Sequence, residues 1–192
     1  METLLSILVG VGLSAACGFR IFIPPLIISI AAHAGHLTLS PDFAWMGTQP
    51  ALIAFAVATV LEIAAYYIPR LDNLLDTIAT PAAIVAGTVV TAAMITGMSP
   101  FLKWTLAVIA GGGVAGVVQG STVFARGLST AGTGGLANPI LATVELGGSI
   151  LTSILALVVP VLALLLLVVF AVVIGWKLAT KKSIKVVPAG SG

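Results

Sequence analysis

Five long apolar stretches constrain this chain more than any other feature of its sequence. They cover approximately residues 3–34, 51–68, 81–98, 104–125 and 139–176. Only 7% of the chain is charged, whereas a soluble domain has about 25% charged residues. About 20 apolar residues cross a bilayer as a helix, and runs such as 158–175 lack the polar–apolar alternation of membrane β-barrel strands. The sequence therefore predicts an all-α fold, a polytopic helical membrane protein.

The first and last stretches are too long for one simple crossing. They contain about 32 and 38 residues, and as straight helices they would be about 48 and 57 Å long at 1.5 Å per residue. The hydrocarbon core is about 30 Å thick, so each stretch must bend, fold back or cross twice. Both contain helix breakers, which are Gly18, Pro24 and Pro25 in the first stretch and Gly147, Gly148 and Pro160 in the last. We therefore expect about five to six membrane segments with broken or re-entrant helices.

The connecting segments indicate how the chain is oriented and bounded. Residues 69–81 read as a short amphipathic helical turn capped by prolines, and residues 125–139 as a connection rich in Gly, Ser and Thr. Residues 177–185 hold four lysines, so the positive-inside rule places the C-terminus in the cytoplasm. We expect one transmembrane helical domain over 1–186, with 187–192 (VPAGSG) as an appended remnant outside it.

Arg20 lies in the middle of the first apolar stretch, just before the double proline. An arginine at the centre of a membrane helix costs about 2.5–3.5 kcal/mol on insertion scales, so it is kept where it faces a cavity, pairs with a carboxylate or reaches the interface. Pro24 and Pro25 have no backbone N–H, and the carbonyls that they leave free are tolerated at membrane depth only beside protein or water. Arg20 is therefore either a residue at a bend or in an ion pair that fixes packing, or an anion-binding or gating group. We favour the second interpretation, in which the helix break lines a wet internal chamber.

Three acids in and after the second stretch are further candidates. Glu62 lies near the end of its stretch and shares a helix face with Tyr66, four residues later. It is either a partly solvated or arginine-paired acid, or a counter-ion for Arg20 or a coupling carboxylate. Asp72 and Asp76 are also four residues apart, so a helix would bring their carboxylates together. They suit a solvated cytoplasmic turn, with Asp76 near the start of the next helix, and a cation site or an interface is the alternative.

Arg126, Asn138 and Glu145 surround the Gly-rich connection. Asn138-Pro139 is typical of an N-cap followed by proline at the first helical position, and backbone amides at such a helix start can bind an anion. Glu145 would lie almost two turns further in, ahead of a glycine pair, as in the interior of a re-entrant element. An ion pair of Glu145 with Arg126 or Arg20 that only fixes packing is the alternative.

Several classes of function lack support in the sequence. A single cysteine, Cys17, excludes an internal disulfide and a cysteine-cluster metal site. The net charge of +2 is too small to suggest nucleic acid as a partner. No HExxH, GxSxG, P-loop or CxxC motif occurs. We therefore expect a protein that is not an enzyme and has no cofactor or bound metal.

Four blocks of the sequence resemble a known family. They are GFR…PP (18–25), E…IPRLDNLLD (62–76), a small-residue helix that ends in arginine (111–126) and NP followed by Glu (138–145). The chain resembles a family of small bacterial integral membrane proteins classed only as a domain of unknown function, over most of residues 3–150. The family pattern carries over to Gly18, Arg20, Pro24, Glu62, Pro69, Asp72, Asp76, Pro81, Asn138 and Glu145. The resemblance implies a bacterial inner-membrane location and brings no activity with it.

Together these features favour a small transporter or channel for an anionic or phosphate-bearing solute. Arg20, and in some measure Arg126, would contact the anion, while Glu62 and Glu145 neutralise charge or couple protons. A cation or divalent-metal permease that uses the acids is one alternative, and a non-transporting scaffold or assembly factor is another.

The expected partners are the lipid bilayer and a small solute or ion. One chain of this length makes a narrow helical bundle, so a homodimer would be a natural assembly. Small-residue faces at 10–14 (GVGLS) and 111–116 (GGGVAG) suit close helix contacts of this kind.

Overall fold

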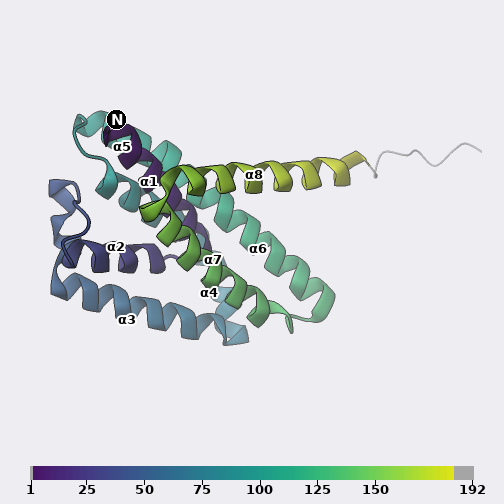
Figure 1. Ribbon diagram of the computed structural model, residues 1–192. Helices are drawn as coiled ribbons and strands as arrows, with labels where there is room; N and C mark the ends of the chain where they lie inside the picture. Colours follow the sequence, from purple (N-terminus) through teal and green to yellow (C-terminus); the bar gives the residue numbers. More distant parts are fainter. Residues whose placement is uncertain (1, 184–192) are drawn as a thin grey trace, which may run out of the picture.

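The computed structural model describes residues 2–183, and these residues form helices without a β-strand (Figure 1). In chain order the elements are α1 (Glu2–Phe19), α2 (Ile23–His33), η1 (Pro41–Gly47), α3 (Gln49–Tyr66), α4 (Pro69–Met94), α5 (Pro100–Leu106), η2 (Ala107–Gly112), α6 (Gly113–Thr133), α7 (Asn138–Val158) and α8 (Pro160–Ser183). η1 is a 3-10 helix and η2 is a π-helix. The side chains of 69–76 and of several positions in α8 lie outside the described part, as does the tail 187–192. The all-α prediction is confirmed.

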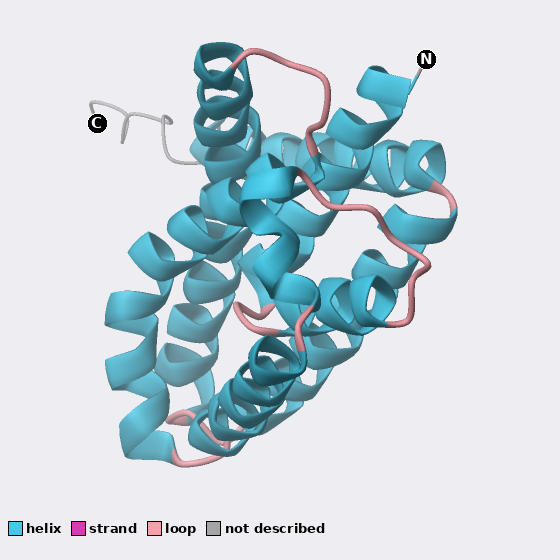
Figure 2. Cartoon of the chain, turned by 90° about the vertical axis from the view of Figure 1, so that its left-hand side faces the viewer, coloured by secondary structure: helices cyan, strands magenta, loops and turns pink. Residues whose placement is uncertain are grey.

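Within the described residues, four helical segments are long and apolar enough to cross a membrane. They are Gln49–Tyr66, Thr77–Met94, Pro100–Thr133 and Asn138–Val158. Shorter apolar helices accompany them at Thr3–Phe19, Ile23–His33 and Pro160–Val169. Mostly short loops join these helices, as Figure 2 shows. The chain is a multi-pass integral membrane protein, as the apolar stretches predicted.

The first apolar stretch is broken between α1 and α2, close to the predicted position. Residues 20–22 are not helical, and Pro24 and Pro25 fall in the first turn of α2, where a missing N–H removes no helical hydrogen bond. Gly18 is not part of the break, because it lies inside α1. A Cβ at Gly18 would be 2.6 Å from the Cβ of Val118, so this glycine lets α6 approach α1 closely.

The last apolar stretch bends at Pro160 and not at the glycine pair. α7 runs without interruption through Gly147 and Gly148 and ends at Val158. The next residue, Val159, has a φ of −137° and a ψ of 71°, which are not helical. α8 then leaves α7 in a new direction (Figure 1). The expectation of a re-entrant element over 139–148 is therefore wrong. A glycine costs about 1 kcal/mol in a helix interior, which the packing of α7 along α1 outweighs.

Two predicted connections are shorter than expected because helices continue through them. α4 is a single helix with Pro81 inside it, so 69–81 is not a separate capped turn. A proline in this position removes one helical hydrogen bond and bends the helix without ending it. α6 also extends into the Gly-rich connection, so only 134–137 join it to α7. Gly134 and Gly135 have φ values of 63° and 87°, a backbone conformation that favours glycine.

α1 lies at the centre of the bundle and contacts α4, α6, α7 and α8 (Figure 1). Its glycines allow this, since a Cβ at Gly10 would lie 3.1 Å from Thr91 of α4, and one at Gly12 would lie 2.8 Å from Ala156 of α7. Gly111, in η2, is pressed against α4 in the same way. Gly10, Gly12 and Gly111 are thus occupied by contacts within one chain.

Candidate functional site

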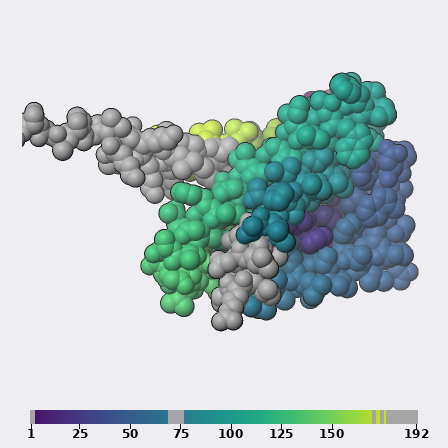
Figure 3. All heavy atoms as spheres, turned by 180° about the vertical axis from the view of Figure 1, so that it is seen from behind, coloured from purple at the N-terminus to yellow at the C-terminus, as the bar shows by residue number. Residues whose placement is uncertain are grey.

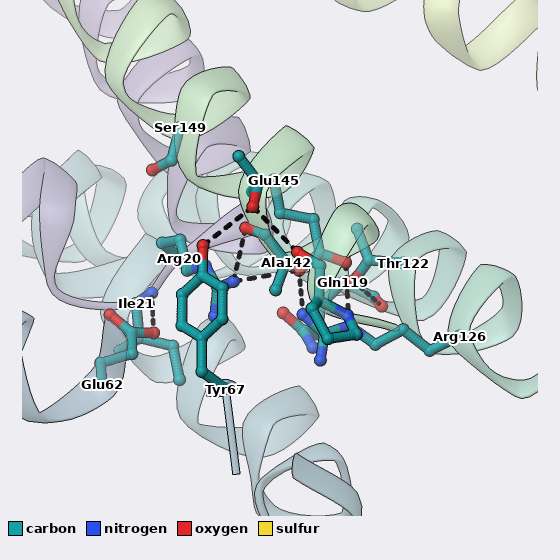
Figure 4. A network of polar contacts seen from close by, with 12 residues as sticks. Arg20, Ile21, Glu62, Tyr67, Gln119, Thr122, Arg126, Ala142, Glu145 and Ser149 are labelled. Carbon is teal, nitrogen blue, oxygen red and sulfur yellow. Dashed lines mark hydrogen bonds and ion pairs between the residues drawn. The ribbon is translucent and has the colours of Figure 1, made fainter. Parts of the chain in front are cut away.

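Two arginines meet at one carboxylate in the interior of the bundle (Figure 4). Arg126 of α6 holds Glu145 of α7 with two hydrogen bonds, Nε to Oε1 at 3.0 Å and Nη2 to Oε2. Arg20, the first residue after α1, places its Nη2 3.6 Å from Oε2 of the same carboxylate. The same Nη2 donates to the backbone oxygen of Ala142, one turn earlier in α7, at 2.7 Å. The sequence predicted both ion pairs as the structural interpretation of these residues, and both are present.

The three charged groups are enclosed by protein. The residues Arg20, Arg126 and Glu145 are 1%, 2% and 7% exposed. The ring of Tyr66, in the last turn of α3, lies against both guanidinium groups, with their Cζ atoms 3.9 and 4.2 Å from its centroid. Both arginines thus contact the same carboxylate and the same aromatic ring. Nε and Nη1 of Arg20 are buried and have no hydrogen-bond partner among the described residues.

Glu62 stabilises the helix break from the other side. Its carboxylate accepts hydrogen bonds from the backbone N–H groups of Ile21 and Phe22, at 2.7 and 3.0 Å. These amides stand at the start of α2, where a helix has unpaired donors and favours negative charge. Glu62 is 8% exposed and is one helical turn before Tyr66, on the same face of α3 as predicted. Its hydrogen bonds are to this backbone, so it is not a direct counter-ion of Arg20.

Asn138 and the two aspartates of α4 complete the predicted set. Asn138 is the first residue of α7, and the N-cap position belongs to Ala137, so the predicted capping role is wrong by one residue. The Asn138 side chain instead donates from Nδ2 to Oγ1 of Thr130 at 3.2 Å and ties α7 to α6. Asp72 lies in the first turn of α4 and Asp76 one turn further along, so Asp76 does not begin a separate helix; the side chains of both are outside the described part.

Two adjoining cavities lie beside the helix break, between α3 and α4. Their volumes are about 480 and 530 Å³, and Ile21, Phe22, Ile78 and Ala82 line both. We call them together the α3–α4 groove. Glu62 and Tyr66 line its smaller part, whereas Arg20, Arg126 and Glu145 line neither cavity. Arg20 is therefore packed inside protein in this conformation, in place of the expected wet chamber.

A third buried cation, in addition to Arg20 and Arg126, was not identified from the sequence. Lys103 of α5 is 6% exposed, and its Nζ lies 2.6 Å from Oδ2 of Asp42 and 3.3 Å from Oγ of Ser40. The sequence did contain a sign of this ion pair. Lys103 directly precedes the apolar stretch 104–125, and Asp42 lies between the stretches 3–34 and 51–68. Both positions could therefore have been assigned to the ends of membrane segments.

Comparisons with known proteins identify the family of the chain but no activity. Comparison with curated proteins and with solved structures finds no match. One family model, described as a domain of unknown function (DUF4126), matches residues 7–180. This agrees with the resemblance seen in the sequence blocks and extends it through α7 and most of α8. The chain belongs to the DUF4126 family of proteins of unknown function.

Proposed function

We propose that this protein is a small membrane transporter or channel for an anionic or phosphate-bearing solute. The observation that carries the proposal is the environment of Arg20, which is buried at a helix break, lies beside the Glu145 carboxylate that Arg126 also contacts, and has two nitrogen atoms, Nε and Nη1, without a hydrogen-bond partner among the described residues. An anion that enters this position would supply the missing acceptors.

The energetics favour a ligand over an empty packing site. A buried donor without a partner costs about 1–3 kcal/mol, and more when the group is charged. Polar and ionisable groups kept inside membrane proteins commonly mark solute or ion pathways. In this proposal Arg20 and Arg126 contact the anion, Glu145 sets the charge of the empty state, and Glu62 holds the broken backbone open beside them. Asn138 fixes α7 relative to α6.

The proposal is tested by flux measurements in proteoliposomes with inorganic phosphate, phosphate esters and divalent cations as separate solutes. Arg20→Gln should abolish the anion flux, because Gln lacks the charge and most of the donors. Lys103→Gln is the matched control, since it removes another buried cation from a distant pair. Anion flux that survives Arg20→Gln at the wild-type rate would contradict the proposal.

Two alternatives make different predictions. A cation or divalent-metal permease has less support, because Glu62 is held by backbone amides and Glu145 by arginines, and the described residues contain no group of three potential metal ligands. A scaffold or assembly factor is favoured by the enclosure of the charged cluster. It predicts that Arg20→Gln changes folding or partner binding in a protein with no flux for any solute.

The location and assembly follow from the same proposal. A multi-pass protein of a bacterial inner membrane, with its C-terminus in the cytoplasm, is supported by the four lysines of 177–185. A non-enzymatic role is supported by the lack of catalytic motifs. A homodimer remains compatible with the small size of the bundle, and it would require a surface other than the glycine faces of α1 and η2.

A further inference from the structure

The α3–α4 groove has the dimensions of one lipid chain. On α3 it extends from Phe55 to Tyr66, which is about 17 Å at 1.5 Å per residue, and on α4 from Ile78 to Val90, about 18 Å. The hydrocarbon core of a bilayer is about 30 Å thick, so the chains of one leaflet cover about 15 Å. The volume of each part also falls in the range of about 300–1,000 Å³ that is typical of small-molecule sites.

The groove faces the membrane. Its rims carry Leu61, Ile78 and Val85, which are 64%, 55% and 62% exposed, and its lining is almost entirely apolar. In Figure 3, atoms of the N-terminal part of the chain are visible between α3 and α4, where Ile21 and Phe22 form the floor of the groove. Because α3 is long enough to span the bilayer, a groove along it runs across one leaflet.

The two ends of the groove differ in polarity. Trp45 and Phe55, with ring centroids 6.0 Å apart, line one end. Glu62 and Tyr66 line the other end, in the last two turns of α3, and this end of a spanning helix lies close to a membrane interface. The Tyr66 ring also lies against the guanidinium groups of both buried arginines. Both arginines therefore lie one side chain away from this end of the groove. The Glu62 carboxylate, which lines it, is already held by the backbone N–H groups of Ile21 and Phe22.

We propose that the α3–α4 groove binds an acyl chain of a membrane phospholipid, with the lipid phosphate at the Glu62–Tyr66 end. The chain lies along α3 as it would lie in a leaflet, and the phosphate faces the arginines across or past the Tyr66 ring. The substrate class is thus a phosphate-bearing lipid, in contrast to a free phosphate. The headgroup assignment rests on the proposed anion site, whereas the chain assignment rests on the groove alone.

The test is native mass spectrometry of the full chain in detergent, with one defined lipid added at a time. The probes are dioleoyl phosphatidic acid, dioleoylglycerol and inorganic phosphate. Ala82→Phe fills the groove at a position that lines both of its parts, and Ala58→Phe fills the part next to Glu62. Ala64→Phe is the matched control, because this exposed alanine of α3 lines neither part.

We expect one phosphatidic acid per chain, with about tenfold weaker binding of dioleoylglycerol, because a neutral headgroup is not attracted by the two arginines behind Tyr66. Both groove-filling variants should weaken phosphatidic acid binding at least about tenfold, since exclusion of two methylenes suffices for that change. Ala64→Phe should bind as the wild type does, and all variants should melt cooperatively.

Three results would overturn the inference. One is the absence of a retained lipid, and another is binding that Ala82→Phe and Ala58→Phe leave unchanged. The third is binding of inorganic phosphate without lipid, which refutes the lipid assignment and leaves the proposed anion site intact. Conversely, retained phosphatidic acid in a protein without any flux would uphold the groove and refute transport.

Discussion

Replacing Glu145 by Gln should destabilise the protein strongly, because its carboxylate contacts two buried arginines. Gln keeps the size and shape of the side chain and removes its charge. Breaking a single buried ion pair by removing one partner costs about 3–5 kcal/mol, and here both Arg20 and Arg126 lose the contact with this carboxylate. For a chain of this size, 1 kcal/mol shifts the melting temperature by about 2–4 °C. The melting temperature should therefore fall by about 6–20 °C.

The assay is thermal unfolding of the purified protein in detergent, followed by tryptophan fluorescence. Adding Arg126→Gln to Glu145→Gln should recover part of the loss, because one unneutralised cation is removed, and the double-mutant cycle should give a coupling energy of about 1–3 kcal/mol. Asp42→Asn is the matched control, since this acid pairs with Lys103 but its side chain is 72% exposed. Lys103 is itself buried, so the loss of stability should exceed that of an exposed pair, about 0–1 kcal/mol, but it should stay below that of Glu145→Gln because Asp42 is open to its surroundings. A Glu145→Gln protein that melts within about 2–4 °C of the wild type would refute the reasoning.

Three further changes test other contacts of the same bundle. Glu62→Ala should speed hydrogen exchange at the backbone amides that precede α2, since it removes both of their acceptors and each unsatisfied donor costs about 1–3 kcal/mol. Glu62→Gln should have a smaller effect, because one acceptor oxygen remains. Gly18→Ala should lower stability by about 1–3 kcal/mol, because the new Cβ would lie 2.6 Å from the Cβ of Val118. Gly120 has open space around it, so Gly120→Ala should raise stability by about 0.5–1 kcal/mol, the cost of a glycine inside a helix. In thermal unfolding, Tyr66→Leu should destabilise the protein more than Tyr66→Phe. Only the Leu variant loses the two cation–π contacts, which contribute about 0.5–2 kcal/mol each.

The sequence contained most of the information about which residues form the site. Arg20, Glu62, Arg126 and Glu145 were candidates because ionisable groups in apolar stretches must find partners. The structure brings all four together at the ends of α1, α3, α6 and α7. The sequence did not determine which partner each of these residues has. The negative charge of a glutamate is satisfied equally well by an arginine, as for Glu145, or by two backbone amides, as for Glu62. The amides of residues 21 and 22 become available to Glu62 only once the helix is broken there.

Helix continuity was the least predictable property of the fold. Pro81 and the pair Gly147-Gly148 are local helix breakers, yet α4 and α7 pass through them. Pro160 and residues 20–22 do interrupt their helices. Inside a helix, a glycine costs about 1 kcal/mol and a proline about 3 kcal/mol relative to alanine. Contacts with neighbouring helices decide whether the helix continues in spite of that cost. Those contacts join residues far apart in the sequence, so no local pattern records them.

The π-helical turn η2 determines the direction in which the side chains of α6 point around the helix axis. Each π-turn inserts one extra residue into an α-helix, and one residue corresponds to about 100° of rotation about the helix axis. Lys103 precedes this insertion and Arg126 follows it, in one unbroken stretch of 34 residues. The insertion therefore sets the phase between the two buried cations of this helix. Deleting a single residue from 107–112 would let this segment form a regular α-helix and keep the phase between Lys103 and Arg126. Forcing the present sequence into a continuous α-helix would instead turn Arg126 by about 100° away from Glu145.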